Sequence, residues 1–391
     1  MRILMISKAC VVGAYQRKLE EIAACPGVEL TLAVPAAWRD ERGVLRLERA
    51  HTQGYALVVE PIIFNGSFHF HFYPRLGRLL AELKPDIVHM DEEPYNFATW
   101  HAFRLARRYN SKLLFFSWQN LLRPYPFPFN YFEREVLHSA HAAIVGNQEA
   151  GDVWRTKGYT GPISVIPQFG VDPEIFRPKA EGGTLRVKDE DERNFHAKRS
   201  REAFTRSVHP SSFTVGYAGR LVHPKGIDLL LRAVAQLPAA AQVHLVGSGP
   251  ERVRLQRLAA QLGLQDRLRI EALIPSTQMP NYFVGLDCLV LPSRTQPNWK
   301  EQFGRVLIEA MACGVPVVGS MCGEIPNVIG EAGLIFPEED VAALAAHLRR
   351  LQESPAEREA LAERGRARVL EHYTHRQIAQ KTVEVYRSIS A

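Results

Sequence analysis

The 391-residue sequence has few cysteines, no long apolar run and no large excess of charge of one sign. Its five cysteines are scattered and form no Cys-x-x-Cys pair, so neither a disulfide framework nor a zinc site is supported and we expect reduced thiols. No stretch approaches the ~18 consecutive apolar residues of a membrane-spanning helix. The apolar run within residues 1–8 is too short for a secretion signal, and we expect a cytoplasmic protein.

The net charge of +6 is spread along the chain. Residues 1–178 carry 20 Lys and Arg against 18 Asp and Glu, a difference of +2, and residues 179–391 carry 28 against 24, a difference of +4. A nucleic-acid-binding protein usually shows a basic stripe, so we expect no nucleic-acid partner. A mildly basic protein still suits anionic small molecules, or peripheral contact with the anionic inner face of a membrane.

Short β-branched apolar runs alternate with amphipathic helical stretches along the whole chain. This alternation is typical of β-α-β units, in which helices cover a parallel sheet. The fold class is therefore α/β, with two doubly wound domains. The expected strands are 3–7, 28–34, 56–60, 86–90, 112–117, 142–146 and 164–166, then 213–218, 242–247, 267–270, 287–291, 315–319 and 333–336.

Composition also predicts the domain boundaries. The first domain is expected over residues 1–175, ending in the proline- and glycine-containing segment 169–178. Residues 179–212 are rich in charge and indicate an exposed surface insertion. The second domain is expected over residues 213–375, and a final helix near 376–391 is expected to cross back onto the first domain.

The first chemical motif follows the strand 213–218 and opens a helix: Gly216-Tyr-Ala-Gly219-Arg220-Leu-Val-His-Pro-Lys225-Gly226. Its glycines permit a tight turn, and a helix start offers unpaired N–H groups. Arg220 and Lys225 add two cations, which suits a diphosphate. A plain turn with two surface cations is the alternative.

A second strand-to-helix turn carries Gly247-Ser-Gly249. These glycines would either let the backbone approach a nucleotide or only permit close packing. The residues alone do not decide between the two.

The longest motif, between residues 291 and 320, runs strand, loop, helix, strand. Glu301 precedes the helix, and Glu309 lies within about 80° of the same face at ~100° per residue. Two such carboxylates can accept hydrogen bonds from hydroxyl pairs, while the N–H groups around 303–305 favour an anion. The pattern suits a nucleotide sugar, although isolated glutamates more often only compensate the helix dipole or face solvent.

These motifs together resemble glycosyltransferase family 4, a retaining, nucleotide-sugar-dependent family with the GT-B fold of two Rossmann-like domains facing across a cleft. The resemblance rests on the Gly219-to-Gly226 loop, on Glu301-x7-Glu309 with Phe303-Gly304, and on the run Glu309-Ala-Met-Ala-Cys-Gly-Val-Pro-Val-Val. It is most specific over about residues 213–340.

The resemblance implies a catalytic role for Arg220 and Lys225, which would hold the donor diphosphate and stabilise the leaving nucleotide. It implies that Glu301 binds hydroxyls of the donor sugar. The further donor-binding residues that it implies are Gly13, Gly219, Gly247, Gly249, Phe303, Gly304, Arg305 and the ribose-binding Glu309. The nucleotide-diphosphate sugar would be a co-substrate, and neither a cofactor nor a metal is expected.

The first domain departs from the family pattern. Only Gly13 remains of a glycine pair after the first strand, and Gln119 stands where the family often has a histidine. Acceptor-side residues are therefore assigned only by their position after strands: Asp91, Glu92, Glu93, Trp118, Gln119 and Asn147. The three carboxylates would recognise acceptor hydroxyls or cap the following helix, and Asn147 and Glu149 would equally cap theirs.

Two other patterns carry less chemistry. Residues 64–75 interleave aromatic residues with His69 and His71, which would form an acceptor-binding or membrane-facing lip or an ordinary packed segment, but hardly a metal site. Asp189-Glu-Asp191 matches the Asp-x-Asp of metal-dependent transferases. It lies in the charged insertion, however, so we interpret it as a solvated charge run.

The leading hypothesis is a retaining glycosyltransferase that moves a hexosyl-type sugar to a hydroxyl of a saccharide, lipid-linked or small-molecule acceptor. Surface polysaccharide, lipid-linked saccharide and small-glycoside synthesis all fit. A nucleotide-sugar epimerase of the same fold and a non-catalytic nucleotide-sugar-binding protein stay open. A dehydrogenase is disfavoured, because no Gly-x-Gly-x-x-Gly follows either domain's first strand.

Overall fold

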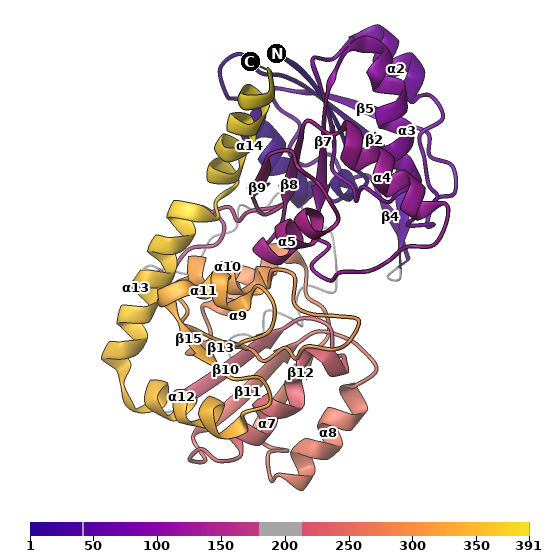
Figure 1. Cartoon of the computed structure of the whole chain (residues 1–391). Coiled ribbons are helices and arrows are strands. Elements are labelled where there is room, and N and C mark those ends of the chain that lie inside the picture. Colours follow the sequence, from indigo (N-terminus) through magenta and orange to yellow (C-terminus); the bar gives the residue numbers. More distant parts are fainter. Residues whose placement is uncertain (41–42, 180–212, 391) are drawn as a thin grey trace. The chain divides into compact units, whose positions relative to one another are not determined.

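A computed structural model describes residues 1–40, 43–179 and 213–390. The chain divides into two compact units, Met1–Val171 together with Glu371–Ala391, and Asp172–Leu370 (Figure 1). The Asp189-Glu-Asp191 run and nearly all of the charged insertion lie outside the described residues.

Seven parallel strands form the main sheet of the first unit, in the order β5-β2-β1-β6-β7-β8-β9. All the strands expected here are present, each within one residue of its expected bounds. They are β1 (Arg2–Ile6), β2 (Glu29–Pro35), β5 (Ala56–Glu60), β6 (Ile87–Met90), β7 (Lys112–Ser117), β8 (Ala142–Val145) and β9 (Ile163–Val165). The strand order reverses between β1 and β6, which is where doubly wound sheets bind ligands.

The second unit repeats this plan with six parallel strands in the order β12-β11-β10-β13-β14-β15. These expected strands are also present, within two residues of their bounds. They are β10 (Phe213–Ala218), β11 (Ala241–Val246), β12 (Leu268–Glu271), β13 (Cys288–Leu291), β14 (Val317–Ser320) and β15 (Leu334–Phe336). The order reverses between β10 and β13, so the two doubly wound sheets predicted from the sequence are confirmed.

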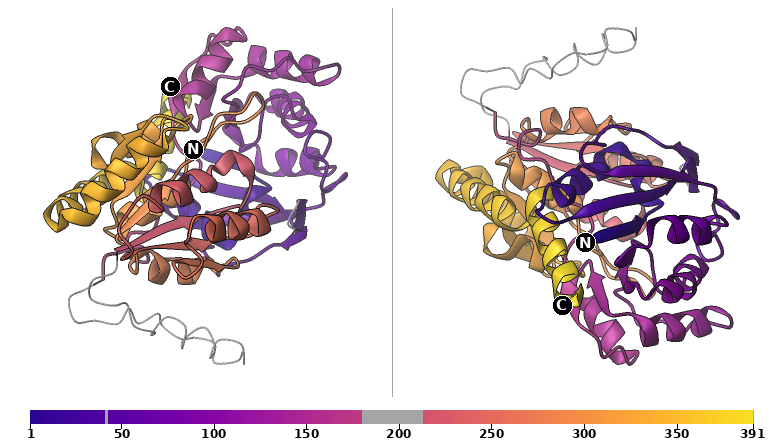
Figure 2. Two further views of the ribbon diagram at one scale, coloured as in Figure 1. Left: turned by 90° about the horizontal axis from the view of Figure 1, so that it is seen from below. Right: turned by 90° about the horizontal axis from the view of Figure 1, so that it is seen from above.

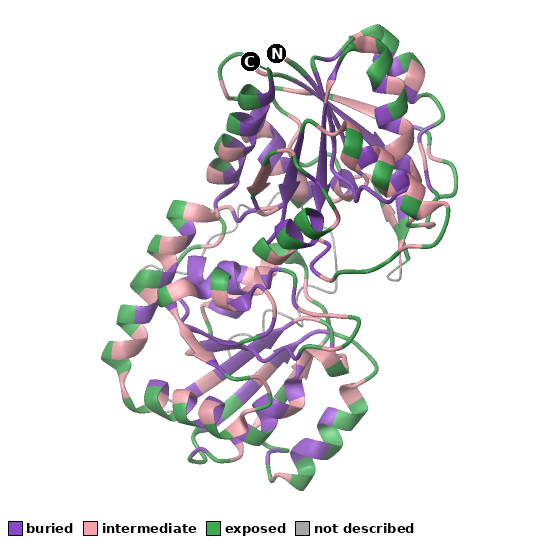
Figure 3. Ribbon diagram, in the orientation of Figure 1, coloured by how far each residue is buried: buried purple, intermediate pink, exposed green. Residues whose placement is uncertain are grey.

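Helices surround each sheet, and in both units the central strands are buried while the outer helix faces are exposed (Figure 3). The first unit has α1 (Arg17–Ala23), α2 (Leu76–Leu83), α3 (Phe97–Ala106), α4 (Phe129–Ser139), α5 (Gln148–Thr156) and α14 (His375–Ser390). The second has α7 (Ile227–Val234), α8 (Arg252–Gln261), α9 (Met279–Phe283), α10 (Arg305–Ala312), α11 (Ile325–Ile329), α12 (Val341–Glu353) and most of α13 (Pro355–His372). None of the described helices combines the length and the apolar character needed to cross a membrane.

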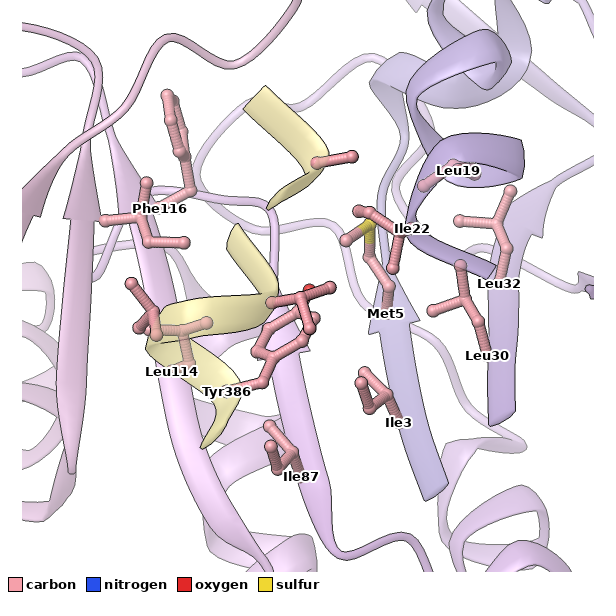
Figure 4. Packing of buried hydrophobic residues seen from close by; sticks show 14 of the residues in the cluster. Ile3, Met5, Leu19, Ile22, Leu30, Leu32, Ile87, Leu114, Phe116 and Tyr386 are labelled. Carbon is pink, nitrogen blue, oxygen red and sulfur yellow. The ribbon is translucent and has the colours of Figure 1, made fainter. Parts of the chain in front are cut away.

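The last helix belongs to the first unit and packs against α1 (Figure 2). Its Tyr386 side chain is fully buried among Met5, Ile22 and Leu114 from one face of the sheet and from α1 (Figure 4). The Tyr386 hydroxyl is also hydrogen-bonded to His89 Nδ1, at 2.7 Å. Helix α14 therefore completes the core of a unit whose other elements lie at the opposite end of the sequence.

A short antiparallel hairpin of β3 (Ala37–Asp40) and β4 (Gly43–Arg46) was not expected from the sequence. All five cysteines are unpaired thiols. Buried apolar side chains rather than covalent links therefore hold the described units together.

Two glycines of the second unit have similar backbone conformations but differ in how closely other loops approach them. Gly226 has φ +63°, and a Cβ atom there would lie 1.9 Å from the Pro292 carbonyl oxygen. Gly263 has φ +68°, but nothing lies within 4 Å of its Cβ position.

We expect Gly263→Ala to lower the melting temperature by about 2–4 °C through backbone strain alone. Gly226→Ala should lower it by at least twice as much, because a collision with Pro292 adds to the strain. Differential scanning fluorimetry of both variants measures the difference. Equal losses would contradict the close approach of the two loops.

Candidate active site

In the second unit the loops that follow β10 and β13 meet at the reversal of strand order. The Arg294 N–H donates to the Pro224 carbonyl oxygen at 2.8 Å, and the Pro292 carbonyl occupies the space that a side chain at Gly226 would fill. One loop carries Lys225 and the other carries Glu301. The structure therefore brings two of the three predicted catalytic residues together.

Lys225 and Glu301 form a close ion pair. The ammonium lies 2.5 Å from Glu301 Oε2, and the Ser293 hydroxyl donates to the same oxygen at 2.9 Å. The two side chains are only 15% and 10% exposed. The Lys225 ammonium also lies 5.0 Å from the ring centroid of Trp299.

Ser293 and Trp299 were not among the predicted site residues. Ser293 directly follows Pro292 after a buried strand, which is the position where loops of parallel sheets carry ligand contacts. Its position could therefore have identified it. The contact of Trp299 with Lys225 joins residues far apart in sequence, and no local pattern predicts it.

The third predicted catalytic residue, Arg220, starts the same loop as Lys225 and has an exposed side chain. Its carbonyl oxygen accepts a hydrogen bond from the Tyr217 hydroxyl at 2.8 Å. This hydrogen bond fixes the loop to the strand β10. Arg294, which sequence analysis did not single out, is buried and pairs with Asp228 at 3.1 Å.

The turns after β10 and β11 lie backbone against backbone. The Gly219 N–H donates to the Val246 carbonyl oxygen at 2.9 Å. A Cβ atom at Gly247 would lie 1.8 Å from the Gly219 carbonyl oxygen, and one at Gly249 would lie 2.3 Å from that of Leu221. Close packing is therefore one reason for both glycines, and their contact with a nucleotide stays a prediction.

Helix α10 begins directly after Gly304, whose φ of +79° places it in the left-handed region. Phe303 before it is buried. Within the helix, Arg305 Nε lies 2.7 Å from Glu309 Oε1, one turn further on. A ribose bound to Glu309, as the resemblance implies, would therefore share this carboxylate with Arg305.

In the first unit, the three carboxylates after β6 are buried and bind neighbouring loops. The Ser7 hydroxyl donates to Asp91 Oδ2 at 2.7 Å. The Lys8 ammonium pairs with Glu92, whose other oxygen lies 3.5 Å from His71 Nε2. A buried carboxylate needs such partners because it has lost its water.

The interpretation that these carboxylates cap the following helix is wrong. Helix α3 begins at Phe97, and its N-cap residue Asn96 makes no side-chain capping hydrogen bond. The carboxylates instead hold together the loops that follow three different strands. Their recognition of an acceptor stays a prediction.

Glu93 connects this cluster to the loop after β7. Its two oxygens accept hydrogen bonds from the Ser117 hydroxyl at 2.6 Å and from the Trp118 N–H at 2.8 Å. The Gln119 N–H in turn donates to the Ser117 hydroxyl at 3.0 Å, and the Tyr125 hydroxyl donates to Gln119 Oε1 at 2.9 Å. Three of the predicted acceptor-side residues, Glu93, Trp118 and Gln119, are thus brought together.

The remaining predicted residues of this unit have local partners. Asn147 Oδ1 accepts from the Ala150 N–H at 2.8 Å, so Asn147 caps α5, as one of its two interpretations had it. Glu149 accepts from Asn120 at 3.3 Å. The Gly13 N–H donates to Glu48 Oε2 at 2.7 Å.

The aromatic segment 64–75 lies partly exposed and partly against the carboxylate cluster. Phe64, Phe68 and Phe70 are exposed, yet the Phe68 ring also lies 4.6 Å from the Lys8 ammonium. His71 is fully buried, and its Nδ1 lies 3.0 Å from the Ser67 carbonyl oxygen. Within the described ranges, no three His, Cys, Asp or Glu side chains are grouped so that they could hold a metal ion.

Two adjacent glutamates of the cluster titrate in opposite directions. Burial raises the pKa of Glu92, but the Lys8 ammonium and His71 outweigh it and lower this pKa to about 2. Burial raises the pKa of Glu93 to about 7, although Ser117 and the Trp118 N–H favour its charged form. Glu93 therefore changes its charge near neutral pH, while Glu92 stays ionised.

The raised pKa of Glu93 predicts a pH-dependent stability. Its folded-state pKa exceeds the ordinary value of 4.5, so the stability that it contributes is present below that value and is lost as the pH rises through about 7. Glu93→Gln keeps a neutral side chain at every pH. We expect its melting temperature to match that of the wild type at pH 5 and to exceed it by about 3 °C or more at pH 8.

Glu92→Gln provides the contrast, because it leaves the buried Lys8 ammonium without its carboxylate and should lower the melting temperature at both pH values. Thermal scans of the three proteins across this range measure the effect. If the difference in melting temperature between Glu93→Gln and the wild type does not increase with pH, Glu93 does not titrate near neutral pH.

Comparison with known proteins adds independent findings. A family model described as "Glycosyltransferase Family 4" matches residues 20–175, and one described as "Glycosyl transferases group 1" matches residues 200–368. The D-inositol 3-phosphate glycosyltransferase of Thermomonospora curvata is 34% identical over 208 residues, which are 49% of this chain and 44% of that protein. This chain spans about half the length of the curated relatives that it matches.

Solved structures share the fold over the full length. Sucrose-phosphate synthase from Thermosynechococcus elongatus has a TM-score of 0.71 at 23% identity, with 100% of this chain and 99% of that chain covered. Anabaena HepE in complex with UDP has a TM-score of 0.70 at 19% identity, with 99% and 100% covered. At such identities the likeness shows the fold alone, and it agrees with the two doubly wound sheets described above.

Proposed function

Because the chain belongs to glycosyltransferase family 4 and has its GT-B fold, we propose that it transfers a hexosyl group from a nucleotide-diphosphate sugar to an acceptor hydroxyl. The transfer would retain the anomeric configuration. The acceptor would be a saccharide, a lipid-linked saccharide or a small molecule in the cytoplasm. The observation that carries the proposal is the Lys225–Glu301 pair at the carboxyl ends of β10 and β13.

The chemistry follows from charge. Negative charge develops on the diphosphate as the bond to the sugar breaks, and cations fixed nearby stabilise it. Lys225 and Arg220 would supply these cations. Glu301 would accept hydrogen bonds from sugar hydroxyls, and the N–H groups at the start of α10 would face a phosphate.

Proton removal from the acceptor needs no dedicated residue of the protein in this scheme. The family's usual front-face mechanism, which the resemblance implies, lets the leaving phosphate assist the incoming hydroxyl. The replacement of histidine by Gln119 would then change acceptor contacts rather than abolish the reaction. We assign those contacts to the loop after β7, which carries Trp118 and Gln119.

The names of relatives and of structural neighbours support a nucleotide-sugar donor. Because these names include both uridine and guanosine nucleotides, both classes of donor should be tested. HepE has been solved with UDP-glucose. A mannosyltransferase of Mycolicibacterium smegmatis, 31% identical over 235 residues, is named as GDP-mannose-dependent. A thermal-shift panel of uridine and guanosine nucleotide sugars would identify the donor, because a ligand at a hundredfold excess over Kd stabilises the native state by about 2.7 kcal/mol.

Replacing either member of the ion pair should abolish transfer. Lys225→Ala removes a cation from the leaving group, and Glu301→Ala removes the ligand of the sugar, so each should lower kcat/KM by at least about a hundredfold. Release of free nucleotide after addition of acceptor measures the rate. Glu331→Gln, an exposed carboxylate-to-amide change in the same unit, is the control.

Near-normal turnover in both alanine variants would contradict the site assignment. Dependence of nucleotide release on the acceptor also separates the proposal from its alternatives, since a 2-epimerase would need no acceptor and a non-catalytic binder would release nothing. The assay is repeated in EDTA, and transfer is expected to continue because the proposal uses no metal.

We also propose peripheral contact with an anionic membrane through the segment 64–75. Phe64, Phe68 and Phe70 are exposed there, and Arg75 follows them. Exposed aromatic side chains and basic residues together favour the interface of an anionic bilayer.

The protein should co-sediment with vesicles that contain phosphatidylglycerol but not with vesicles of pure phosphatidylcholine. The double variant Phe64→Ser with Phe70→Ser should bind the anionic vesicles several-fold more weakly. Equal sedimentation of wild type and double variant would exclude the segment.

A further inference from the structure

The Lys225 ammonium has two close partners within the protein. Glu301 Oε2 lies 2.5 Å away, and the face of Trp299 lies 5.0 Å from it, measured to the ring centroid. Under the proposed function, the Lys225 ammonium and the Glu301 carboxylate must also bind the donor. The ammonium is needed by the diphosphate, and the carboxylate is needed by the sugar.

We propose that Lys225, Glu301 and Trp299 form a latch that the donor opens, with Trp299 as a further sugar-binding residue. In the closed latch, Glu301 and Trp299 hold the ammonium. The donor's diphosphate draws the ammonium away, and the carboxylate and the indole face then bind the hydroxyls and the apolar face of the transferred sugar. This inference rests on the proposed function and extends it to residues that control how the donor is recognised.

The loop that carries Trp299 is anchored on protein groups. Gln296 and Trp299 exchange both backbone hydrogen bonds, at 2.7 and 3.2 Å, which closes a tight turn. Glu338 accepts from the N–H and the hydroxyl of Thr295, both at 2.6 Å, and so fixes the start of the turn. The backbone that carries the indole is therefore fixed by contacts within the protein.

Glu301 is anchored in the same way. Its carbonyl oxygen accepts from the Glu324 N–H at 3.1 Å and fills the space beside Gly323, where a Cβ atom would lie 2.1 Å from it. Its side chain is fixed by the Ser293 hydroxyl. Lys225, with a flexible four-carbon side chain, is therefore the member of the latch that can move.

The exchange of partners is favourable because a diphosphate carries more charge than one carboxylate and binds an ammonium through several oxygens. Opening the latch nevertheless costs free energy, since the ion pair with Glu301 is broken. A sugar returns that free energy by hydrogen-bonding to Glu301 and packing on Trp299. A free nucleoside diphosphate also gains the ammonium, but it offers Glu301 no hydroxyl to replace the lost ion pair.

The latch therefore predicts opposite effects of one substitution on two ligands. Glu301→Gln removes the ion pair, which leaves Lys225 available to any diphosphate. A free nucleoside diphosphate should bind this variant roughly threefold to tenfold more tightly than it binds the wild type. The nucleotide sugar should bind it at least about tenfold more weakly, because an amide is a poorer acceptor than a carboxylate.

Trp299 is tested by a pair of variants. Trp299→Leu should weaken the nucleotide sugar by roughly threefold to tenfold without weakening the nucleoside diphosphate, and Trp299→Phe should restore most of the loss because an aromatic face remains. Glu331→Gln makes the same charge change as Glu301→Gln on an exposed site. It should leave both affinities within about twofold.

Isothermal titration calorimetry of the full chain with UDP, UDP-glucose, GDP and GDP-mannose measures these affinities. A gain for the diphosphate together with a loss for the sugar in Glu301→Gln supports the latch, since damage to the fold would weaken both. Equal losses for both ligands, or an unchanged diphosphate affinity, overturn the latch but not the proposed function. A wild type that binds none of the four ligands overturns the proposed function and the latch with it.

Discussion

The need of a buried charge for a partner organises both candidate sites. Lys225 and Glu301 in the second unit, and Lys8 and Glu92 in the first, are charges that have lost most of their water. Each is tolerable only because an opposite charge lies against it. In both units the pair joins the loops after two neighbouring strands, so it also fixes the local backbone. Ligand recognition and loop geometry therefore depend on the same contacts.

The two units use one topology for different chemistry. In each, the first strand and its neighbour across the reversal of strand order send their loops to the same edge of the sheet. The second unit supplies cations, close backbone turns and a helix start, which suit a diphosphate. The first unit supplies three buried carboxylates, a glutamine and aromatic rings, which offer hydrogen-bond acceptors and apolar faces. The difference lies entirely in the loops, because the sheets themselves are alike.

The periodic features of the sequence predicted the fold well. The contacts between side chains of different loops, by contrast, could not be predicted from the sequence. Buried parallel strands have a local signature, so their positions were predicted within two residues. The hairpin β3–β4 has two strands of four residues each, of which β4 is mostly exposed, and it has no such signature. Lys225 and Glu301 were predicted as separate residues from their motifs. Their direct pairing, and that of Trp299 with Lys225, join positions about seventy-five residues apart. Such residues come together only when β10 and β13 pair in the folded sheet. No local sequence pattern predicts which loop residues then meet.

Helix α14 has a consequence for the order of events during synthesis. The first unit needs Tyr386 and its neighbours to cover Met5, Ile22 and Leu114, yet the ribosome makes the entire second unit before it reaches them. Domains generally fold as their sequence emerges, the N-terminal one first. Here the apolar face of the first sheet must wait, uncovered, for the last helix. The nascent chain therefore has a period in which a chaperone, or another copy of the chain, can find that face before α14 does.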